Sequence, residues 1–346
     1  MKIALVSPNS LRSFGGAERK LIEAAKLLTG KKCEVEIRAF PRLHHKHAVD
    51  VKEYMEGIDY IESWQCRPKV DVVYTVYAVG ISFLIKSDAP IVAGLHSPLL
   101  FRPPEVSRAL ISDPLLYNSL RYTVYCLLAK NLMSGEVNRF DAVRALTMSN
   151  SIQHKRLFVL SQWIDTRTFK PLKAKNDSFT VLFAGRHHWE KGWDIFLNVA
   201  TALKNNGCDM KFVCTGKGVG FIEGLGFLDD KDLAQAFSEA HVTLCPSRAD
   251  TFGNVIIESM ACGTPVITTS IPAHKEIGGP SIFAEPKLDE FTGKLNELYA
   301  VWKEYPDKYQ ELSRKSVKWA QKYSVDVVFP QFFRMLKTVG SDSRSE

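Results

Sequence analysis

The feature that most constrains the fold is a strand–loop–helix pattern that begins each half of the chain. In the first half, a short apolar run, a glycine-containing loop and a helix-spaced apolar pattern occupy residues 3–28, and Gly30 ends the helix. In the second half, the same three parts occupy residues 180–203. Because strands that alternate with helices are typical of doubly wound sheets, we expect one α/β sheet in each half.

Further strands and helices continue both patterns. Near-continuous apolar runs are typical of parallel strands that are buried on both faces. Such runs occur at 35–40, 70–77, 91–95, 211–214, 242–245 and 265–268. We expect helices over most of 286–338, and the segment 99–156 also has a helical pattern, in which Lys and Arg are interleaved with aromatic residues. We interpret 161–177, which contains Pro171 and many polar residues, as a linker.

Length and composition exclude several classes of protein. The 346 residues predict about two domains, and 45% hydrophobic with 24% charged residues is ordinary for a globular protein. No run approaches the about 20 apolar residues that cross a bilayer, and the N-terminal apolar run is too short for a signal peptide. Seven cysteines without a Cys-x-x-Cys pair indicate reduced thiols rather than a zinc site. We therefore expect a cytoplasmic protein.

The net positive charge is confined to the first half. Residues 1–163 contain 22 Lys and Arg against 15 Asp and Glu, whereas residues 164–346 contain 23 of each kind. This asymmetry favours an anionic partner for the first half, either a membrane surface or a phosphate-bearing substrate. The alternative is a solvated surface with a chance imbalance. Nucleic acid is not favoured, because no recognised nucleic-acid-binding motif accompanies the charge.

In each half of the chain, a glycine-containing loop follows the first strand. Gly15 and Gly16 let the backbone approach a ligand at a helix N-terminus, although such a pair is more often a simple turn and does not complete the dinucleotide-binding fingerprint. The loop 185–192 (GRHHWEKG) places Arg186 and Lys191 at the carboxyl end of a strand, where ligands bind in open α/β sheets. Both side chains suit phosphate, and the alternative is two solvated bases.

The strongest signal is the run 250–258 (DTFGNVIIE). Asp250 and Glu258 lie on either side of a loop-to-helix junction near Gly253. The first amides of that helix can hold a diphosphate while the two carboxylates accept hydrogen bonds from hydroxyl groups. The alternative is an N-cap acid and a surface glutamate, but the apolar residues around Glu258 argue against that interpretation.

Three weaker signals involve histidine and aspartate. His96 follows a buried strand, where it either meets a substrate or donates a structural hydrogen bond. The histidine cluster at 44–47 is interpreted as a solvated loop rather than a metal site. The Asp-x-Asp run at 230–232 directly precedes a helix, so we interpret it as an N-cap.

Taken together, these segments resemble the retaining glycosyltransferases of family 4, the glycosyl transferases group 1, which have the GT-B fold. The resemblance runs through nearly the whole chain. The segments that carry it are 15–18, 159–165, 169–171, 185–192, 246–258, 261–266 and 323–324.

The resemblance implies two Rossmann-like, doubly wound domains that face a cleft. The first, on the acceptor side, would comprise residues 1–163 with 325–346, and the second, which binds the nucleotide sugar, would comprise residues 164–324. The implied reaction transfers a sugar of the hexosyl type from a nucleotide diphosphate sugar, with retention of configuration. The acceptor would be a glycan, lipid-linked or other hydroxyl group, and the reaction would need no metal and no cofactor.

The resemblance also implies a role for each candidate residue. Arg186 and Lys191 would offset the charge on the leaving diphosphate in place of a metal, and Glu258 would hold the ribose. Asp250 would hold hydroxyl groups of the donor sugar, and His96 would position or polarise the reacting groups. No residue is expected to act as a nucleophile. The residues implied to contact the donor are Gly15, Gly16, Arg186, Lys191, Gly216, Asp250, Thr251, Phe252, Gly253, Asn254 and Glu258.

Two positions depart from the family pattern. Asp250 stands where the family has glutamate, and its side chain is one methylene shorter. Trp163 stands where the family usually has glycine before Ile-Asp. Three other functions share parts of the pattern: a glycoside hydrolase with Asp250 and Glu258 as paired carboxylates, a GT-B sugar-nucleotide epimerase, and a non-catalytic nucleotide-sugar-binding protein.

The acceptor side carries a separate expectation. The segment 99–156 contains eight Lys and Arg against four Asp and Glu, together with Tyr and Phe. Bases and aromatic rings at helical spacing suit a membrane interface, so we expect peripheral, salt-sensitive contact with the inner face of the membrane. The alternative is a basic rim that steers an anionic or polysaccharide acceptor.

Overall fold

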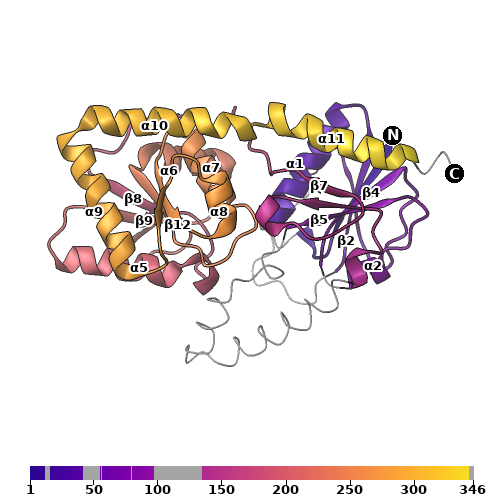
Figure 1. The fold of residues 1–346 in the computed structure, drawn as a ribbon, viewed down its shortest axis with the longest axis horizontal. Helices are drawn as coiled ribbons and strands as arrows, with labels where there is room; N and C mark the ends of the chain where they lie inside the picture. Colours follow the sequence, from indigo (N-terminus) through magenta and orange to yellow (C-terminus); the bar gives the residue numbers. More distant parts are fainter. Residues whose placement is uncertain (12–15, 42–54, 56, 79, 97–134, 343–346) are drawn as a thin grey trace, which may run out of the picture. The chain divides into compact units, whose positions relative to one another are not determined.

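The computed structural model describes residues 1–11, 16–41, 55, 57–78, 80–96 and 135–342. The chain divides into two compact units, residues 1–160 with 330–346 and residues 161–329, which are considered one at a time below (Figure 1). The sequence analysis placed the boundaries after Trp163 and before Val325, and as domain boundaries these stay predictions.

The first unit is built on a seven-stranded parallel sheet. The strands lie in the order β3-β2-β1-β4-β5-β6-β7, which is the Rossmann order of strands with one strand added at the edge. The strands are β1 (Lys2–Ser7), β2 (Glu34–Ala39), β3 (Asp59–Glu62), β4 (Val72–Val76), β5 (Ile91–Leu95), β6 (Ala142–Ala145) and β7 (Leu157–Val159). The four residues from Ile3 to Val6 are fully buried, as expected for a central parallel strand.

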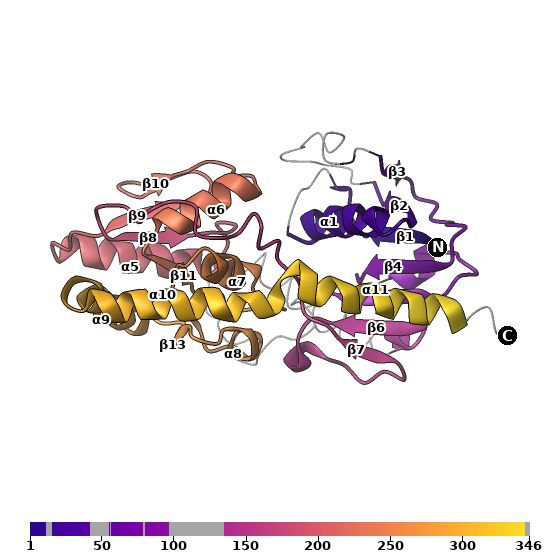
Figure 2. The same ribbon diagram turned by 90° about the horizontal axis from the view of Figure 1, so that it is seen from above.

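Helices cover both faces of this sheet. They include α1 (Gly16–Gly30), α2 (Ile81–Leu84), the short 3-10 helix η4 (Met148–Asn150) and the C-terminal helix α11 (Val325–Asp342). Helix α1 packs against β1 and β2 (Figure 2). The residues of α11 from Pro330 onward belong to this unit. Proline lacks an amide hydrogen, so one i→i−4 hydrogen bond is missing from α11 where the units divide.

The second unit repeats the architecture with six parallel strands in the order β10-β9-β8-β11-β12-β13. The strands are β8 (Thr180–Phe183), β9 (Lys211–Cys214), β10 (Glu223–Gly224), β11 (Val242–Cys245), β12 (Val266–Thr269) and β13 (Ile282–Ala284). In chain order this is again 3-2-1-4-5-6, so the strand order reverses between β8 and β11. Two sheets of this kind confirm the predicted doubly wound α/β class.

Helices lie on both faces of the second sheet as well. They are η5 (Trp189–Lys191), α5 (Trp193–Asn205), α6 (Asp230–Glu239), α7 (Asn254–Ala261), α8 (Pro272–Ile277), α9 (Leu288–Glu304), α10 (Pro306–Ala320) and η6 (Gln321–Tyr323). The core on one face joins Phe183 of β8 and Phe212 of β9 to Phe196 of α5 and Phe291 of α9. On the other face, Ser259 of α7 donates a hydrogen bond to Thr243 of β11.

Part of the helical prediction for 99–156 is wrong. Residues 97–134 lie outside the described residues, but Ala142–Ala145 form the strand β6. Arg144, which the sequence analysis counted among the surface bases, is 1% exposed, and Phe140 is equally buried. All four residues of this strand are buried, and the charged Arg144 among them had indicated an exposed position. The aspartate cap is also displaced by one residue, because Asp229 rather than Asp230 accepts the capping hydrogen bond of α6.

Candidate functional site

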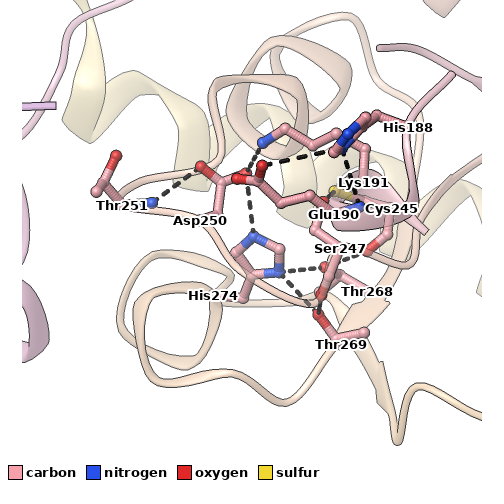
Figure 3. Close-up of polar contacts among 10 residues, drawn as sticks. All are labelled: His188, Glu190, Lys191, Cys245, Ser247, Asp250, Thr251, Thr268, Thr269 and His274. Atoms are coloured by element: carbon pink, nitrogen blue, oxygen red, sulfur yellow. Dashed lines mark hydrogen bonds and ion pairs between the residues drawn. The ribbon is translucent and has the colours of Figure 1, made fainter. Parts of the chain in front are cut away.

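Two loops meet at the point where the strand order of the second sheet reverses. The loop 184–192 follows β8, and the loop 246–253 follows β11, so both leave the carboxyl edge of neighbouring strands. In open α/β sheets this is the place where ligands bind. Lys191 from the first loop and Asp250 from the second come together there, with Lys191 Nζ donating to Asp250 Oδ2 at 2.7 Å (Figure 3). The structure thus brings together two of the residues that the sequence analysis selected separately.

Glycine at position 192 allows this close approach of the two loops. Gly192 adopts a left-handed conformation with φ of 73°, between the 3-10 helix η5 and α5. A Cβ atom at this position would collide with the carbonyl oxygen of Pro246. Only glycine fits both the left-handed backbone and the short distance to Pro246, so Gly192 allows the first loop to lie against the second.

Arg248 ties the same two loops at a second point. Its guanidinium forms a bidentate pair with Asp194 at 2.7 and 2.6 Å, and it also donates to the Trp189 carbonyl oxygen at 2.7 Å. The guanidinium carbon lies 4.5 Å from the Trp189 ring centroid. Sequence analysis missed Arg248, and its neighbouring proline and serine gave no signal that would have distinguished it from a solvated base.

The Asp250 carboxylate is strongly held in its charged form. Burial alone would raise the pKa of Asp250, but the Lys191 ammonium and the His274 ring outweigh burial and hold that pKa well below its usual range. For Lys191, burial would lower the pKa, but the Asp250 carboxylate outweighs the effect of burial, so the pKa of Lys191 is raised. Both residues therefore stay charged at neutral pH. The other Asp250 oxygen accepts a hydrogen bond from the Thr251 amide at 3.0 Å.

His274 is a member of this site that the sequence did not reveal. It is fully buried in α8, and its Nε2 lies 3.7 Å from Asp250 Oδ2. Thr268 donates its hydroxyl hydrogen to the Cys245 carbonyl oxygen at 3.0 Å, so its oxygen accepts from His274 Nδ1 at 2.8 Å (Figure 3). His274 Nδ1 is therefore a hydrogen-bond donor to Thr268, and the Nε2 side of the ring faces the carboxylate.

The helix expected after Gly253 is present as α7. Gly253 precedes it with φ of 92°, and a Cβ atom there would lie 3.1 Å from His274 Nε2. Glu258 is 1% exposed within this helix. Thr251 and Phe252 are also buried, and the Phe252 ring packs on Tyr323 with centroids 5.6 Å apart. Asn254, at the first position of the helix, is partly exposed.

The remaining predicted residues of this unit surround the same loop. Arg186 is exposed beside Gly185. His187 stacks on the Trp193 ring with centroids 3.7 Å apart, and its Nε2 lies 2.7 Å from the Thr215 carbonyl oxygen. Gly216 has φ of 83°, and a Cβ atom there would touch the His187 ring at 3.5 Å. Gly216 is thus held beside the loop that carries Arg186.

The first unit contains the other predicted residues. His96 follows β5 directly, and its Nε2 lies 2.8 Å from the Tyr74 hydroxyl. Burial and the nearby charge of Arg144 together lower the pKa of His96 to about 3. Gly16 begins helix α1, as expected, whereas Gly15 and the histidine cluster at 44–47 lie outside the described residues.

Comparison with known proteins identifies the second unit. The model of the family described as "Glycosyl transferases group 1" matches residues 178–300, which include both loops and α7. Residues 178–300, called the group 1 domain below, are therefore similar to that family. The group 1 domain carries the predicted run 250–258 with aspartate at its first position.

Curated proteins match part of the chain. D-inositol 3-phosphate glycosyltransferase of Paenarthrobacter aurescens is 31% identical over 144 residues, which are 34% of this chain and 35% of that protein. An MMP alpha-(1->4)-mannosyltransferase of Mycolicibacterium hassiacum is 24% identical over 261 residues, 67% of this chain and 62% of that protein. The match to the first of these relatives thus spans about a third of its length.

Solved structures match over the whole chain and show the fold. Sucrose-phosphate synthase from Thermosynechococcus elongatus superposes with a TM-score of 0.74 at 17% identity, covering 99% of this chain and 100% of that one. Anabaena HepE in complex with UDP and glucose gives 0.70 at 17% identity, covering 96% and 99%. The predicted GT-B fold is therefore confirmed.

Two further features bear on function, a membrane-spanning helix and a metal site, and the described part of the chain contains neither. No helix there is long and apolar enough to cross a membrane. Within the same residues, no three His, Cys, Asp or Glu side chains gather as a metal site would require.

Proposed function

We propose that this protein is a retaining glycosyltransferase that moves a sugar from a nucleotide diphosphate sugar to a hydroxyl acceptor. The observation that carries the proposal is the Lys191–Asp250 pair, which lies where the strand order reverses in a group 1 glycosyltransferase domain. This place combines a cation for phosphate with a carboxylate for sugar hydroxyls, which are the two chemical parts of such a donor.

Lys191 and Arg186 supply the positive charge that the leaving diphosphate needs. Lys191 uses one of its three N–H donors on Asp250, so the ammonium has further donors for phosphate oxygens. Its side chain is 25% exposed, which leaves it within reach of a ligand. Arg186 is exposed on the same loop. Donors placed where charge develops stabilise a transition state by about 3–4 kcal/mol each, so the two cations replace a metal.

Asp250 accepts hydrogen bonds from the donor sugar. Lys191, His274 and the Thr251 amide contact its carboxylate, so the side chain loses little conformational freedom when the sugar binds. Glu258 and the first amides of α7 hold the ribose and the diphosphate. Glu258 is buried in α7, so we expect the start of α7 or the neighbouring loop to move when ribose binds to it.

The reaction needs no nucleophile from the protein. The bond between the anomeric carbon and the diphosphate oxygen breaks, and a bond to the acceptor oxygen forms on the same face of the sugar. The acceptor proton passes to the leaving phosphate oxygen, so atoms and charges balance. His96 positions or polarises the reacting groups from the end of β5. The acceptor is a glycan or a lipid-linked hydroxyl, and the basic first half favours an anionic acceptor or a membrane surface.

Binding and turnover are tested separately. A thermal-shift screen against UDP, GDP and ADP sugars identifies the donor, because a ligand at 100 times its Kd stabilises the protein by about 2.7 kcal/mol. Release of the nucleoside diphosphate then measures turnover. Lys191→Ala and Glu258→Ala should each lower kcat/KM by about 10²-fold or more.

The matched control is Lys211→Ala, which removes the same group from an exposed ion pair with Glu223 in the same domain. It should leave kcat/KM within about twofold, since exposed pairs contribute little. Stabilisation by a donor without release of nucleoside diphosphate would instead indicate a binding protein, and unchanged kinetics in Glu258→Ala would show that the nucleotide binds elsewhere.

A further inference from the structure

Three neighbouring strands of the first unit place a tyrosine, a glycine and an arginine on one face of the sheet. Gly94 of β5 pairs with Arg144 of β6 on one side and with Val76 of β4 on the other, and Tyr74 lies two residues before Val76. A Cβ atom at Gly94 would collide with the Tyr74 hydroxyl. Glycine at this position therefore lets the tyrosine side chain cross β5 and reach both Arg144 and His96.

The three side chains form a chain of hydrogen bonds that ends on His96. Arg144 Nη1 donates to the Tyr74 hydroxyl oxygen at 3.2 Å, and the same hydroxyl lies 2.8 Å from His96 Nε2. Tyr74 and Arg144 are 2% and 1% exposed. Phe332 of α11 packs edge-on against the Tyr74 ring with centroids 5.0 Å apart. The guanidinium carbon of Arg144 lies over the Phe332 ring, 4.9 Å from its centroid.

The direction of these hydrogen bonds follows from chemistry. A guanidinium only donates, so the Tyr74 oxygen is an acceptor toward Arg144. Among the described residues the Tyr74 hydroxyl has one other partner, His96 Nε2, and a buried hydroxyl hydrogen without a partner costs about 1–3 kcal/mol. The hydroxyl therefore donates to Nε2. A neutral imidazole that accepts at Nε2 carries its proton on Nδ1.

We propose that Arg144 and Tyr74 are positioning residues that fix His96 as a neutral imidazole with its proton on Nδ1. Nε2 is then occupied by the Tyr74 hydroxyl, so His96 does not act on a substrate as a general acid or base through Nε2. A second proton on the ring would require two donors to face one tyrosine oxygen, beside the charge of Arg144. The statement about acid or base catalysis rests on the proposed function, whereas the assignment of the tautomer does not.

The tautomer can be observed directly in the free protein. Long-range ¹H–¹⁵N spectra of protein labelled with ¹⁵N-histidine distinguish a protonated ring nitrogen from an unprotonated one, and the His96→Gln variant identifies the His96 signals by their absence. We expect Nδ1 to be protonated and Nε2 unprotonated from pH 5 to 8 on the folded wild-type chain. Protonation at Nε2, or titration of His96 within that range, would overturn the proposal without any variant.

Variants then test which residues fix the tautomer. In Tyr74→Phe and Arg144→Met we expect the Nε2-protonated tautomer to appear, whereas Arg144→Lys keeps a charged donor and should restore the wild-type signals. The matched control is Tyr77→Phe, which removes a buried hydroxyl of the same strand segment that donates to Glu136 at 3.0 Å. An unchanged His96 tautomer in Tyr74→Phe, or an equal change in Tyr77→Phe, would contradict the assignment.

Kinetics separate positioning from a general loss of structure. Tyr74→Phe should lower kcat about tenfold to 10²-fold, as small displacements of reacting groups do, with the donor KM within about threefold of wild type. Tyr77→Phe should leave both within about twofold. Equal losses in the two variants would show a structural role only. If the spectra show the expected tautomer and no sugar is transferred, the proposed function fails and the tautomer assignment stands.

Discussion

Replacing Lys191 with methionine removes the ammonium group that holds Asp250 in its charged form. The two side chains are 25% and 15% exposed, so the ion pair is neither fully buried nor free in solvent. Asp250 keeps His274 as a neighbour, but burial, which opposes the charged carboxylate, then weighs more heavily. The variant should therefore lose stability through Asp250 as well as through the missing pair.

The size of the loss follows from the geometry. At 2.7 Å and an effective dielectric constant of about 20, the two charges attract by about 6 kcal/mol, and desolvation of both groups opposes most of this. Exposed pairs contribute about 0–1 kcal/mol, and breaking a buried pair costs about 3–5 kcal/mol, so we expect about 1–3 kcal/mol here.

The pH dependence has a definite sign. Because the pKa of Asp250 lies below its ordinary value of 3.8 in the folded protein, its contribution to stability is present above pH 3.8 and is lost as the pH falls through the folded pKa. The difference in unfolding free energy between wild type and Lys191→Met should therefore be largest near pH 7 and shrink below about pH 4.

Denaturant unfolding at pH 7 and pH 3 measures this difference. A double-mutant cycle of Lys191→Met with Asp250→Asn isolates the pair, and Lys211→Met controls for loss of an exposed lysine. A coupling energy near zero, or an equal loss in Lys211→Met, would refute the argument that this pair is partly buried and mutually stabilising.

Three further predictions concern other parts of the chain. Gly192→Ala should cost more stability than Gly207→Ala in thermal unfolding, because both have φ near 73° but a Cβ atom collides with Pro246 only at Gly192; equal costs would show that the loops yield freely. Burial lowers the pKa of Lys175 to about 7, so stability should rise between pH 7 and 10, and Lys175→Met should reduce that slope in denaturant titrations. Liposome co-sedimentation at low and high salt tests membrane contact by the first half of the chain. The protein should bind anionic vesicles at low salt only, and protein that stays in the supernatant at low salt would exclude membrane contact.

The strands that the sequence predicted are those buried on both faces. Ile91–Leu95 and Lys211–Cys214 are close to the predicted ranges, because burial on both faces leaves a near-continuous apolar run. The edge strand Asp59–Glu62 was missed because its residues are alternately exposed and partly buried. Strand β6 was missed because it contains Arg144, and a charged residue normally indicates an exposed position.

The site was predicted in part for a similar reason. Lys191 and Asp250 each stand in a loop with its own glycine and strand signal, so the sequence identified them separately. Their contact, like the presence of His274 and Arg248 beside them, depends on strands that come together only in the folded sheet. No local pattern encodes such a contact. The run 15–18 lies partly outside the described residues, and its role stays a prediction.

The central claim is metal-independent transfer of a sugar with retention at the Lys191–Asp250 site. The most direct measurement is a ¹H NMR time course of a nucleotide diphosphate sugar with this protein in EDTA, which follows donor loss and the configuration of the first product at its anomeric proton. We expect turnover to persist in EDTA, the first product to keep the donor configuration, and Lys191→Ala to slow donor loss by about 10²-fold. An inverted first product, or turnover that stops in EDTA and returns with magnesium, would contradict the account.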